Sequence, residues 1–503
     1  MALKKLDIPP GVVNHGTDTE AANRWRDTNL VRWSNGALRP VGGWQDYNNA
    51  AGSQVQLDDG SGTQTIPRGA HSWQTFDLGP YLGAGTYNAL YAMDIDGAVT
   101  DITPAGLASG RLGAGENLGF GGKAFGEETF GTARTADGEL INPTTWSLDN
   151  WGEFLVGCST GDGRIFEWQL DTGLNAAALS GAPINNRAMM VTAERVVFAL
   201  GAANNPRKVQ WCDREDNTTW TPAVTNEAGD IELQTNGEIL AGLKVRGRAL
   251  LLTTTDAHLA IYNGPPTVYG FERIGTGCGL IAPLGAVSVD AGAFWMGRNG
   301  FYRYDGNSVQ PLACEVQDYV FTDINRTEIA KTFAVPLQRH NEVWWFYPSG
   351  SSTEPDRYVF FDYLENHWGI GKLARAAGVD YGVFPEPMWF GTDAKLYRHE
   401  RGSTHPGGDV YAETGPMTEG VGDSITHGLW VIPDEKVQGQ VTLTFKTRFH
   451  PNDTERSYGP YTMANPTSVR FAGRQIRMRV DGIDGTAWRV GAMRLDAYAG
   501  GGR

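Results

Sequence analysis

A strand–turn–strand unit that recurs about every 45 residues is the feature that most constrains the fold of this chain. Each copy contains an apolar strand, a small polar turn, a second apolar or aromatic strand, and then an acid with Gly or Asn. The copies begin at Tyr81, Phe154, Val196, Ala249, Ala293, Val343 and Met388. Five of the six intervals measure 42 to 53 residues, close to the roughly 40–50 residues of a four-stranded propeller blade.

One such unit cannot bury both of its faces alone, so the copies are expected to close into a ring. Seven copies predict an all-β fold with a β-propeller of about seven blades, six to eight being the range, over residues 45–402. The first interval is longer because it contains a Gly-rich insertion at 105–134. The 66 glycines and 16 tryptophans among 503 residues suit short strands joined by tight turns. One or two β-sandwiches remain the alternative to the propeller.

After Gly408 the pattern changes to a strict alternation of apolar and polar residues, which is typical of half-buried antiparallel strands. We therefore expect residues 409–503 to form a separate, β-sandwich-like domain. Its last part carries a local charge of +4 between residues 470 and 494. Either a solvated strand face or a docking surface for an acidic neighbour explains this charge. The alternating apolar residues are Val441, Leu443, Phe445, Ile476, Met478 and Val480.

The N-terminal residues 1–44 are expected to form an arm that ends in a hairpin. Asn35-Gly36 lies between short apolar runs and predicts a two-residue turn, which places Arg32 opposite Arg39. Like charges in that position repel, and the hairpin contains no acid to neutralise them. Acids elsewhere in the chain are one explanation. The other is an acidic edge of the next subunit in a ring, with Trp33 and Trp44 as buried anchors.

The cysteine pattern and the net charge restrict the class of protein. The four cysteines lie 54, 66 and 36 residues apart, which fits neither a zinc site nor a disulfide framework. We expect buried free thiols in a chain made in a reducing cytoplasm. The N-terminus lacks the apolar core of a secretory signal. The sequence contains no run of 18 apolar residues, so it predicts no membrane span. A net charge of −15 argues against wrapping nucleic acid on a broadly basic surface.

The sequence contains no recognisable set of catalytic residues. DREDNTTW (213–220) and DYLENHW (362–368) loosely resemble the aspartate boxes of sialidase-type propellers, in which the carboxylate accepts turn amides and the Trp packs the blade. A glycosidase needs two carboxylates that flank one bond. Asp362, Glu365 and Glu342 offer such groups, but their pattern does not distinguish them from other acids.

Other catalytic and cofactor patterns are also missing from the sequence. The nine histidines form no HExxH motif, and neither GxSxG nor a Walker loop is present. In the insertion, Phe120, Phe125 and Phe130 are each followed by Gly, which favours a projecting contact loop. We predict no catalytic residue, cofactor or metal ligand.

Four stretches together carry a resemblance that is spread over most of the chain. They are LDIPPGVVNHGTDTEAANRWRDTNLVRWSNGALRPVGGW (6–44), VTDITP (99–104), DREDNTTWTP (213–222) and VRFAGRQIRMRVDG…WRVGAMRLD (469–496). With the Gly/aromatic insertion, these stretches resemble the propeller-containing nozzle or packaged-DNA stabilisation proteins of tailed-bacteriophage tails. The proteins that this chain resembles come from short-tailed phages. A long-tailed phage that uses the same fold elsewhere in its tail would give much the same resemblance.

The resemblance implies a structural virion protein, not an enzyme, that is assembled in the host bacterial cytoplasm and resides in the virion tail. It implies a homohexameric ring below the portal and adaptor that closes the tail, retains packaged DNA and conducts it without tight binding during ejection. Its partners would be its own copies, the portal, adaptor and other tail proteins, and viral DNA. The alternative is a propeller hydrolase or carbohydrate-binding module that acts on host surface polysaccharide. The residues that we expect at interfaces are Arg32, Trp33, Arg39, Trp44, Phe120, Phe125, Phe130, Arg474, Arg477 and Arg479.

Overall fold

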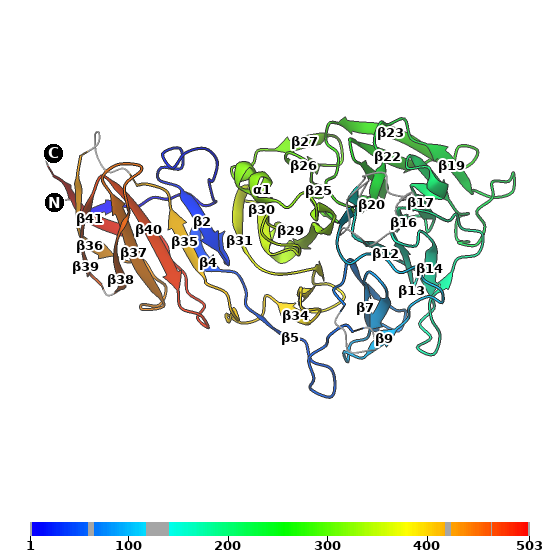
Figure 1. The fold of residues 1–503 in the computed structure, drawn as a ribbon, viewed down its shortest axis with the longest axis horizontal. Coiled ribbons are helices and arrows are strands. Elements are labelled where there is room, and N and C mark those ends of the chain that lie inside the picture. Colours follow the sequence, from blue (N-terminus) through cyan, green and yellow to red (C-terminus); the bar gives the residue numbers. More distant parts are fainter. Residues whose placement is uncertain (1–2, 59–64, 117–139, 418–423, 464, 501–503) are drawn as a thin grey trace, which may run out of the picture.

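A β-propeller and a β-sandwich lie side by side in the computed structural model of this chain (Figure 1), which describes residues 3–58, 65–116, 140–417, 424–463 and 465–500. The propeller contains seven four-stranded antiparallel sheets. The inner strands follow one another around the ring in chain order, and β32 of the last blade returns to β6 of the first. The all-β propeller that the repeat predicts is therefore confirmed, with seven blades.

Each blade runs from an inner to an outer strand. The first four blades are β6 (Ala70–Gln74), β7 (Pro80–Gly85), β8 (Leu90–Met93) and β9 (Val99–Asp101); β12 (Trp146–Trp151), β13 (Phe154–Ser159), β14 (Ile165–Trp168) and β15 (Ala177–Ala178); β16 (Ala188–Val191), β17 (Val197–Leu200), β18 (Lys208–Trp211) and β19 (Gly229–Glu232); and β20 (Ile239–Val245), β21 (Arg248–Thr253), β22 (Asp256–Tyr262) and β23 (Tyr269–Thr276).

The last three blades complete the ring. They are β24 (Ala286–Val289), β25 (Gly292–Met296), β26 (Phe301–Tyr304) and β27 (Val309–Leu312); β28 (Phe333–Leu337), β29 (Glu342–Tyr347), β30 (Arg357–Asp362) and β31 (His367–Lys372); and β32 (Ala377–Val379), β33 (Met388–Phe390), β34 (Leu396–His399) and β5 (Trp44–Asp46). The recurring sequence unit corresponds to the second and third strands of every blade. These strands lie between neighbours, so they carry the aromatic and β-branched residues that suit a buried sheet.

The seventh blade takes its outer strand from the N-terminal part of the chain. β5 pairs antiparallel with β34, with Asp46 opposite Tyr397 and Trp44 opposite His399. The ring is thus closed by hydrogen bonds between segments that are about 350 residues apart. Residues 44–46 therefore belong to the propeller.

The sandwich consists of two sheets that share an apolar core. The first sheet contains β1 (Leu3–Lys5), β41 (Arg494–Ala499), β36 (Thr426–Ile432) and β39 (Thr467–Gly473), and the second contains β2 (Trp25–Asn29), β35 (Tyr411–Thr414), β40 (Gln475–Gly482), β37 (Val441–Arg448) and β38 (Arg456–Thr462). On β37 every second residue is buried, as the alternation predicts. The rings of Phe445 on β37 and Phe471 on β39 are 4.5 Å apart and join the two sheets.

The expected N-terminal arm, residues 1–44, is wrong for its described part, residues 3–44, which does not form an arm of its own. β1 and β2 are edge strands of the two sandwich sheets, because each finds an unpaired neighbour there. Between them and the propeller lies the expected hairpin, β3 (Val31–Ser34) and β4 (Ala37–Pro40). Both central residues of its turn have positive φ, 51° for Asn35 and 73° for Gly36, which is the geometry that an Asn-Gly turn favours.

Main-chain and side-chain hydrogen bonds join the sandwich directly to the sixth blade. Thr28 on β2 donates its hydroxyl to the Ile370 carbonyl over 2.7 Å, and the Lys372 N–H donates to Asn29 Oδ1 over 2.7 Å. One apolar core also runs without interruption through the fifth and sixth blades, the hairpin and the sandwich. The two domains therefore form one body.

The remaining described elements are short. The helical ones are α1 (Gln317–Asp323) and three single 3₁₀ turns, η1 (Ala202–Asn204), η2 (Ile329–Lys331) and η3 (Gln338–His340). Among the described residues, no helix has the length and apolar composition to cross a membrane. A two-stranded sheet of β10 (Gly115–Glu116) and β11 (Leu140–Ile141) lies in the connection between the first two blades. It marks the described base of the Gly-rich insertion, and it belongs to no blade.

The four cysteines are free, and three of them are buried. Burial raises the pKa of Cys158, Cys212 and Cys314 to about 12 and that of Cys278 to about 11. At pH 8 only about 1 in 10⁴ of a thiol with a pKa near 12 is ionised, against about a quarter of an ordinary thiol.

We expect the thiols of the native protein to react with a disulfide reagent orders of magnitude more slowly than those of the guanidinium-unfolded chain. Rapid native labelling of two or more thiols would contradict this burial.

Candidate functional site

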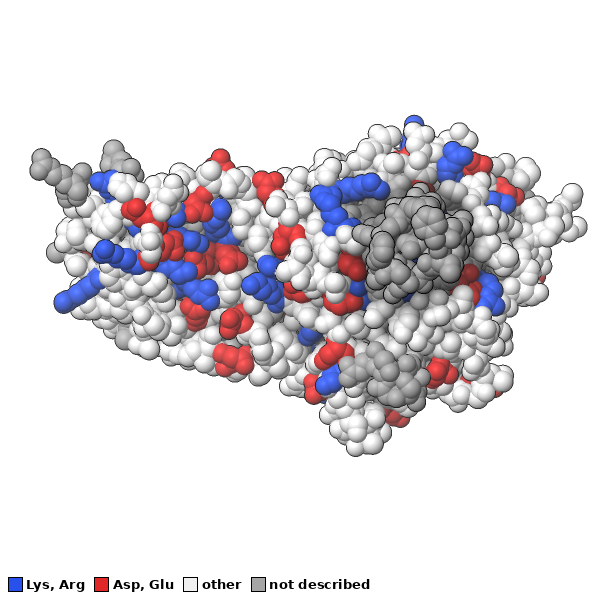
Figure 2. All heavy atoms as spheres, viewed as in Figure 1, with Lys and Arg blue, Asp and Glu red and all other residues white. Residues whose placement is uncertain are grey.

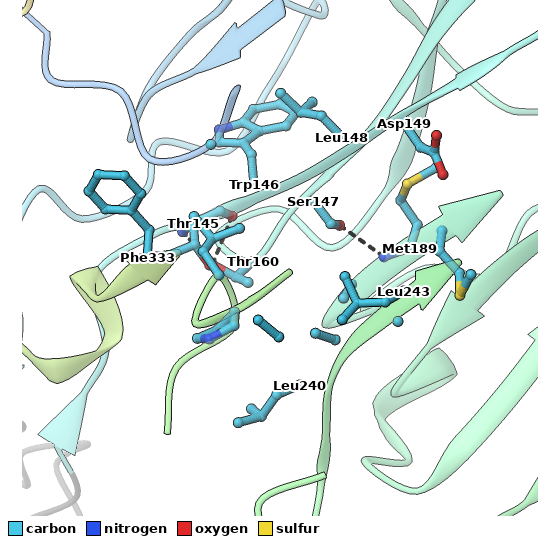
Figure 3. A pocket seen from close by; sticks show the side chains of 18 of the residues that line it. Thr145, Trp146, Ser147, Leu148, Asp149, Thr160, Met189, Leu240, Leu243 and Phe333 are labelled. Atoms are coloured by element: carbon cyan, nitrogen blue, oxygen red, sulfur yellow. Dashed lines mark hydrogen bonds between the residues drawn. The ribbon is translucent and has the colours of Figure 1, made fainter. Parts of the chain in front are cut away.

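The central channel of the propeller contains a narrow cavity. The inner strands of the ring line a cavity of about 200 Å³ (Figure 3), where Met189 on β16, Leu240 and Leu243 on β20 and Phe333 on β28 supply apolar surface. This volume is below the ~300–1,000 Å³ of ordinary small-molecule sites. A DNA duplex, whose major groove alone is about 12 Å wide, does not fit in it.

Two polar side chains along this channel, Ser147 and Asp149, already bind main-chain atoms of a neighbouring strand. Ser147 Oγ accepts the N–H of Met189 over 2.9 Å, and Asp149 Oδ2 accepts the N–H of Val191 over 2.9 Å. Both bonds connect β12 of the second blade to β16 of the third. Asp149 Oδ1 also accepts a hydrogen bond from Lys244 Nζ on β20 over 2.8 Å. In the described part of the lining these groups hold adjacent blades together.

A buried ionic cluster neutralises Arg32, one member of the like-charge pair in the hairpin. Arg32 faces Arg39 in the β3–β4 register, but its guanidinium turns into the propeller. Its Nη1 donates to Glu400 Oε2 over 2.8 Å, its Nη2 donates to Glu342 Oε2 over 2.9 Å, and its Nε lies 2.9 Å from Glu342 Oε1. The Arg32 and Glu342 side chains are each 2% exposed. The acids that neutralise the hairpin therefore come from the same chain.

Burial and charge act in opposite directions on the pKa values in this cluster. Burial alone would lower the pKa of Arg32, but Glu342 and Glu400 raise it above its ordinary value. Burial would raise the pKa of Glu400, but Arg32 and His340 lower it well below its ordinary value. Burial dominates at Glu342 and raises its pKa. A carboxylate held in this way serves as a counter-ion inside the protein.

The prediction that Arg32, Trp33 and Trp44 lie at an interface between subunits is thus wrong. Arg32, Trp33 and Trp44 are 2%, 3% and 6% exposed, because the hairpin is wedged between the two domains of one chain. Trp44 stacks on His399 with ring centroids 5.6 Å apart. Arg39 is half-buried, with its Nη2 3.4 Å from His340 Nδ1, and its place at an interface stays a prediction.

Two arginines of the C-terminal basic stretch, Arg477 and Arg479, have acidic partners within the sandwich. Glu413 on β35, itself buried, lies 2.6 Å from Arg477 Nη2 and 3.8 Å from Arg479 Nη1. Arg477 also pairs with Glu455 and Arg479 with Asp481, while Arg474 is half-buried. Lysine, arginine and acidic side chains are interleaved over the sandwich face seen in Figure 2. The expected interface residues Phe120, Phe125 and Phe130 lie outside the described residues.

The two stretches that resemble aspartate boxes are structural turns. In the first, the Asp216 carboxylate accepts the Thr218 N–H over 2.9 Å, and the buried Trp220 donates its Nε1–H to the Asn217 carbonyl over 2.7 Å. In the second, Asp362 Oδ1 accepts the N–H groups of Leu364 and Glu365 over 2.9 and 2.8 Å. Each carboxylate shapes a turn, as the structural interpretation of these boxes predicts.

The carboxylates that could have formed a glycosidase pair are placed differently. Glu342 is buried in the Arg32 cluster, and Asp362 is buried at the end of β30. Glu365 alone of the three is exposed. Because two of the three carboxylates are enclosed, this set does not present a carboxylate pair at the surface.

Two groups of ionisable residues were missed by the sequence analysis. In one, Glu354 accepts hydrogen bonds from Arg68 Nη2 over 2.6 Å and from Lys331 Nζ over 2.8 Å. Glu328 pairs with Lys331 over 3.1 Å and accepts the Ala114 N–H at the base of the insertion. Arg68 comes directly before the first blade, and the acids lie near the sixth, which explains why no local motif revealed them.

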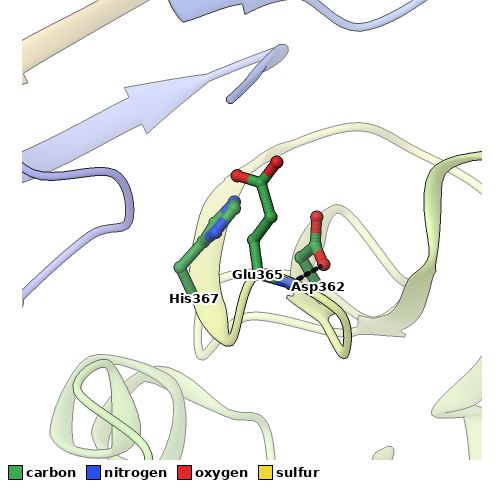
Figure 4. Close-up of side chains that lie close together, drawn as sticks. All are labelled: Asp362, Glu365 and His367. Atoms are coloured by element: carbon green, nitrogen blue, oxygen red, sulfur yellow. Dashed lines mark hydrogen bonds between the residues drawn. The ribbon is translucent and has the colours of Figure 1, made fainter. Parts of the chain in front are cut away.

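The other group contains His367 with Asp362 and Glu365. One ligand atom from each of these side chains lies within 4.8 Å of the others. All three project from the turn between β30 and β31 toward the same side (Figure 4). The only sequence signal was the D-x-x-E-x-H spacing in DYLENHW, in which His367 was not considered.

Comparisons with known proteins find propellers. No family model matches the chain, and no curated protein matches it significantly. Virginiamycin B lyase from Staphylococcus aureus is similar over 71% of this chain and 98% of its own, with 8% identity and a TM-score of 0.40. YCF48 from Cyanidioschyzon merolae is similar over 73% and 99%, with 12% identity and a TM-score of 0.36. The Pan2 WD40 domain of Neurospora crassa is similar over 73% and 95%, with 8% identity and a TM-score of 0.38.

Proposed function

We propose that this protein is a structural component of a bacteriophage tail, a nozzle or hub ring that closes the tail, retains packaged DNA and conducts it during ejection. The observation that supports this best is the role of residues 6–44, the longest stretch of the resemblance. This stretch supplies sandwich strand β2, the buried hairpin and the start of β5. A chain whose two domains share one core suits the wall of a rigid assembly.

The size of the channel and the net charge favour a DNA path between subunits. The cavity of about 200 Å³ within one propeller is too small for a duplex, so the lumen would be enclosed by several chains. Each chain contributes a net charge of −15. An acidic wall repels phosphates and therefore lets DNA slide without sticking.

Measuring the oligomeric state tests whether the protein assembles into a ring. We expect a species of six times the 54.6 kDa chain mass by light scattering, either for the free protein or after mixing with its portal–adaptor complex, and rings in negative-stain images. A map of the source particle with this fold in the tail would support the proposal. A protein that stays monomeric under both conditions and is absent from virions would contradict it. Turnover of a host polysaccharide would instead favour the glycan-acting alternative.

The same proposal makes a prediction about DNA. The affinity of a protein for DNA falls with salt concentration, and each phosphate that the protein neutralises contributes about 0.9 to the slope of log affinity against log salt concentration. A wall that neutralises few phosphates therefore shows a small slope. We expect no measurable affinity for duplex DNA at physiological salt in an electrophoretic or anisotropy titration. A basic DNA-binding protein serves as the positive control. Tight, salt-sensitive binding by the free subunit would count against the conduit.

Charge reversal of Arg477 and Arg479 would not be a clean test of assembly. Both side chains pair with the buried Glu413, so their reversal would place like charges together inside the sandwich. A failure to assemble would then report a damaged domain as readily as a lost interface. The oligomeric measurement on the unmodified chain avoids this problem.

A further inference from the structure

The turn between β30 and β31 brings one imidazole and two carboxylates together. Asp362, the last residue of β30, and His367, the first residue of β31, are direct antiparallel partners, and their side chains therefore project from the same face of the sheet. Glu365 lies in the turn between them. A ligand atom of each side chain is within 4.8 Å of the other two, and Figure 4 shows all three pointing to one side of the turn.

His367 is the unusual member of this group. It is only 5% exposed, and neither of its ring nitrogens makes a hydrogen bond of ordinary geometry to any described residue. The carbonyl of Glu365 lies close to the ring, so one nitrogen can donate its hydrogen there and leave the other facing the carboxylates. A buried polar atom without a partner is unfavourable. The ring therefore indicates a ligand that is bound between it and the acids.

We propose that this group binds one divalent transition-metal ion of the zinc class, with His367, Asp362 and Glu365 as its protein ligands and water at the open position. Zinc accepts imidazole nitrogen and carboxylate oxygen at about 2.0–2.2 Å, so small side-chain movements would bring all three atoms to one ion. The imidazole disfavours Ca²⁺ and Mg²⁺, which prefer oxygen ligands.

The surroundings would hold the ligands in place. Asp362 Oδ1 already accepts two main-chain N–H groups, which orients the carboxylate and leaves Oδ2 for the ion. The Trp33 ring packs edge-on against the His367 ring, with centroids 5.4 Å apart, and fixes its plane. Such partners around a ligand set its orientation and affinity.

The position of the site assigns the ion a structural task. Glu365 Oε1 accepts the N–H of Asn35, at the tip of the β3–β4 hairpin, over 3.1 Å. An ion that orders the exposed Glu365 would thereby strengthen the link between the sixth blade and the hairpin that joins the domains.

The experiment uses the full chain after treatment with a chelator and dialysis, titrated with Zn²⁺ in a calorimeter, and with Co²⁺ while its visible absorption is recorded. We expect one Zn²⁺ per chain, and Co²⁺ bands that zinc displaces. Glu365→Gln, which keeps the oxygen that accepts from Asn35, is expected to weaken Zn²⁺ binding at least about tenfold. His367→Gln is expected to abolish it. Glu272→Gln, an exposed glutamate on β23, is the matched control and should bind like the wild type.

The Glu365 variant keeps the test valid if the buried His367 variant does not fold, because the exposed Glu365 does not support the core. Circular dichroism of each variant monitors the fold. Absence of saturable wild-type binding with a dissociation constant below about 100 µM would overturn the site. Wild-type affinity in the folded Glu365→Gln variant would overturn it equally.

Discussion

Replacing Arg32 with alanine is expected to lower the free energy of unfolding by about 3–5 kcal/mol. The guanidinium is 2% exposed and contacts both Glu342 and Glu400, so its loss leaves two carboxylates near each other without their shared cation. Glu342 is fully enclosed and cannot turn to water. The loss should appear as a lower urea midpoint, followed by tryptophan fluorescence.

An exposed arginine gives the matched control for this measurement. Arg207 pairs with Glu232 over 2.5 Å, and their side chains are 46% and 45% exposed. Solvent screens such a pair, so Arg207→Ala is expected to change the free energy of unfolding by no more than about 1 kcal/mol. Similar small losses for both variants would show that the hairpin cluster contributes little to stability.

Removal of residues 1–46 is expected to abolish cooperative folding of the remaining chain. The deletion removes β5, which closes the seventh blade, together with β2 and the hairpin that fills the space between the domains. It exposes the edge of β34 and uncovers the buried Glu342. We expect the truncated chain to lack a sharp thermal transition and to elute as aggregates in size-exclusion chromatography.

A shorter deletion separates this effect from a general sensitivity of the N-terminus. The described residues 3–5 form the exposed edge strand β1, so a chain that lacks the first five residues should keep its transition within a few degrees of the full-length value. A cooperative, monomeric 47–503 fragment would refute the structural role that we assign to β5 and the hairpin.

The repeated blades could be predicted from the sequence because the second and third strands of each blade are local and strongly apolar. EVWWFY and RYVFFD, on β29 and β30, are almost entirely buried and read as strands without any knowledge of the fold. The alternation on β37 was equally clear. Short strands at the edges gave no such signal. β5 spans only three residues, and its pairing with β34 depends on the closure of the whole ring.

Long-range side-chain contacts account for what the sequence did not reveal. The like-charge pair of Arg32 and Arg39 correctly indicated that acids must come from outside the hairpin. The partners, Glu342 and Glu400, lie 310 and 368 residues away, and 57 acids were available. The group around His367 was missed for a different reason. Its members are close in sequence, but the burial that isolates the imidazole depends on the distant hairpin that packs against it.

The closure of the seventh blade by β5 has a consequence for synthesis on the ribosome. Asp46 leaves the ribosome about 350 residues before its partner Tyr397. At roughly 5–20 residues per second, this strand waits for tens of seconds. During that interval Trp25, Trp33 and Trp44, all buried in the finished protein, have no surface to pack against. The nascent chain therefore presents a long-lived apolar segment to chaperones, and slow translation should increase the risk of aggregation rather than reduce it.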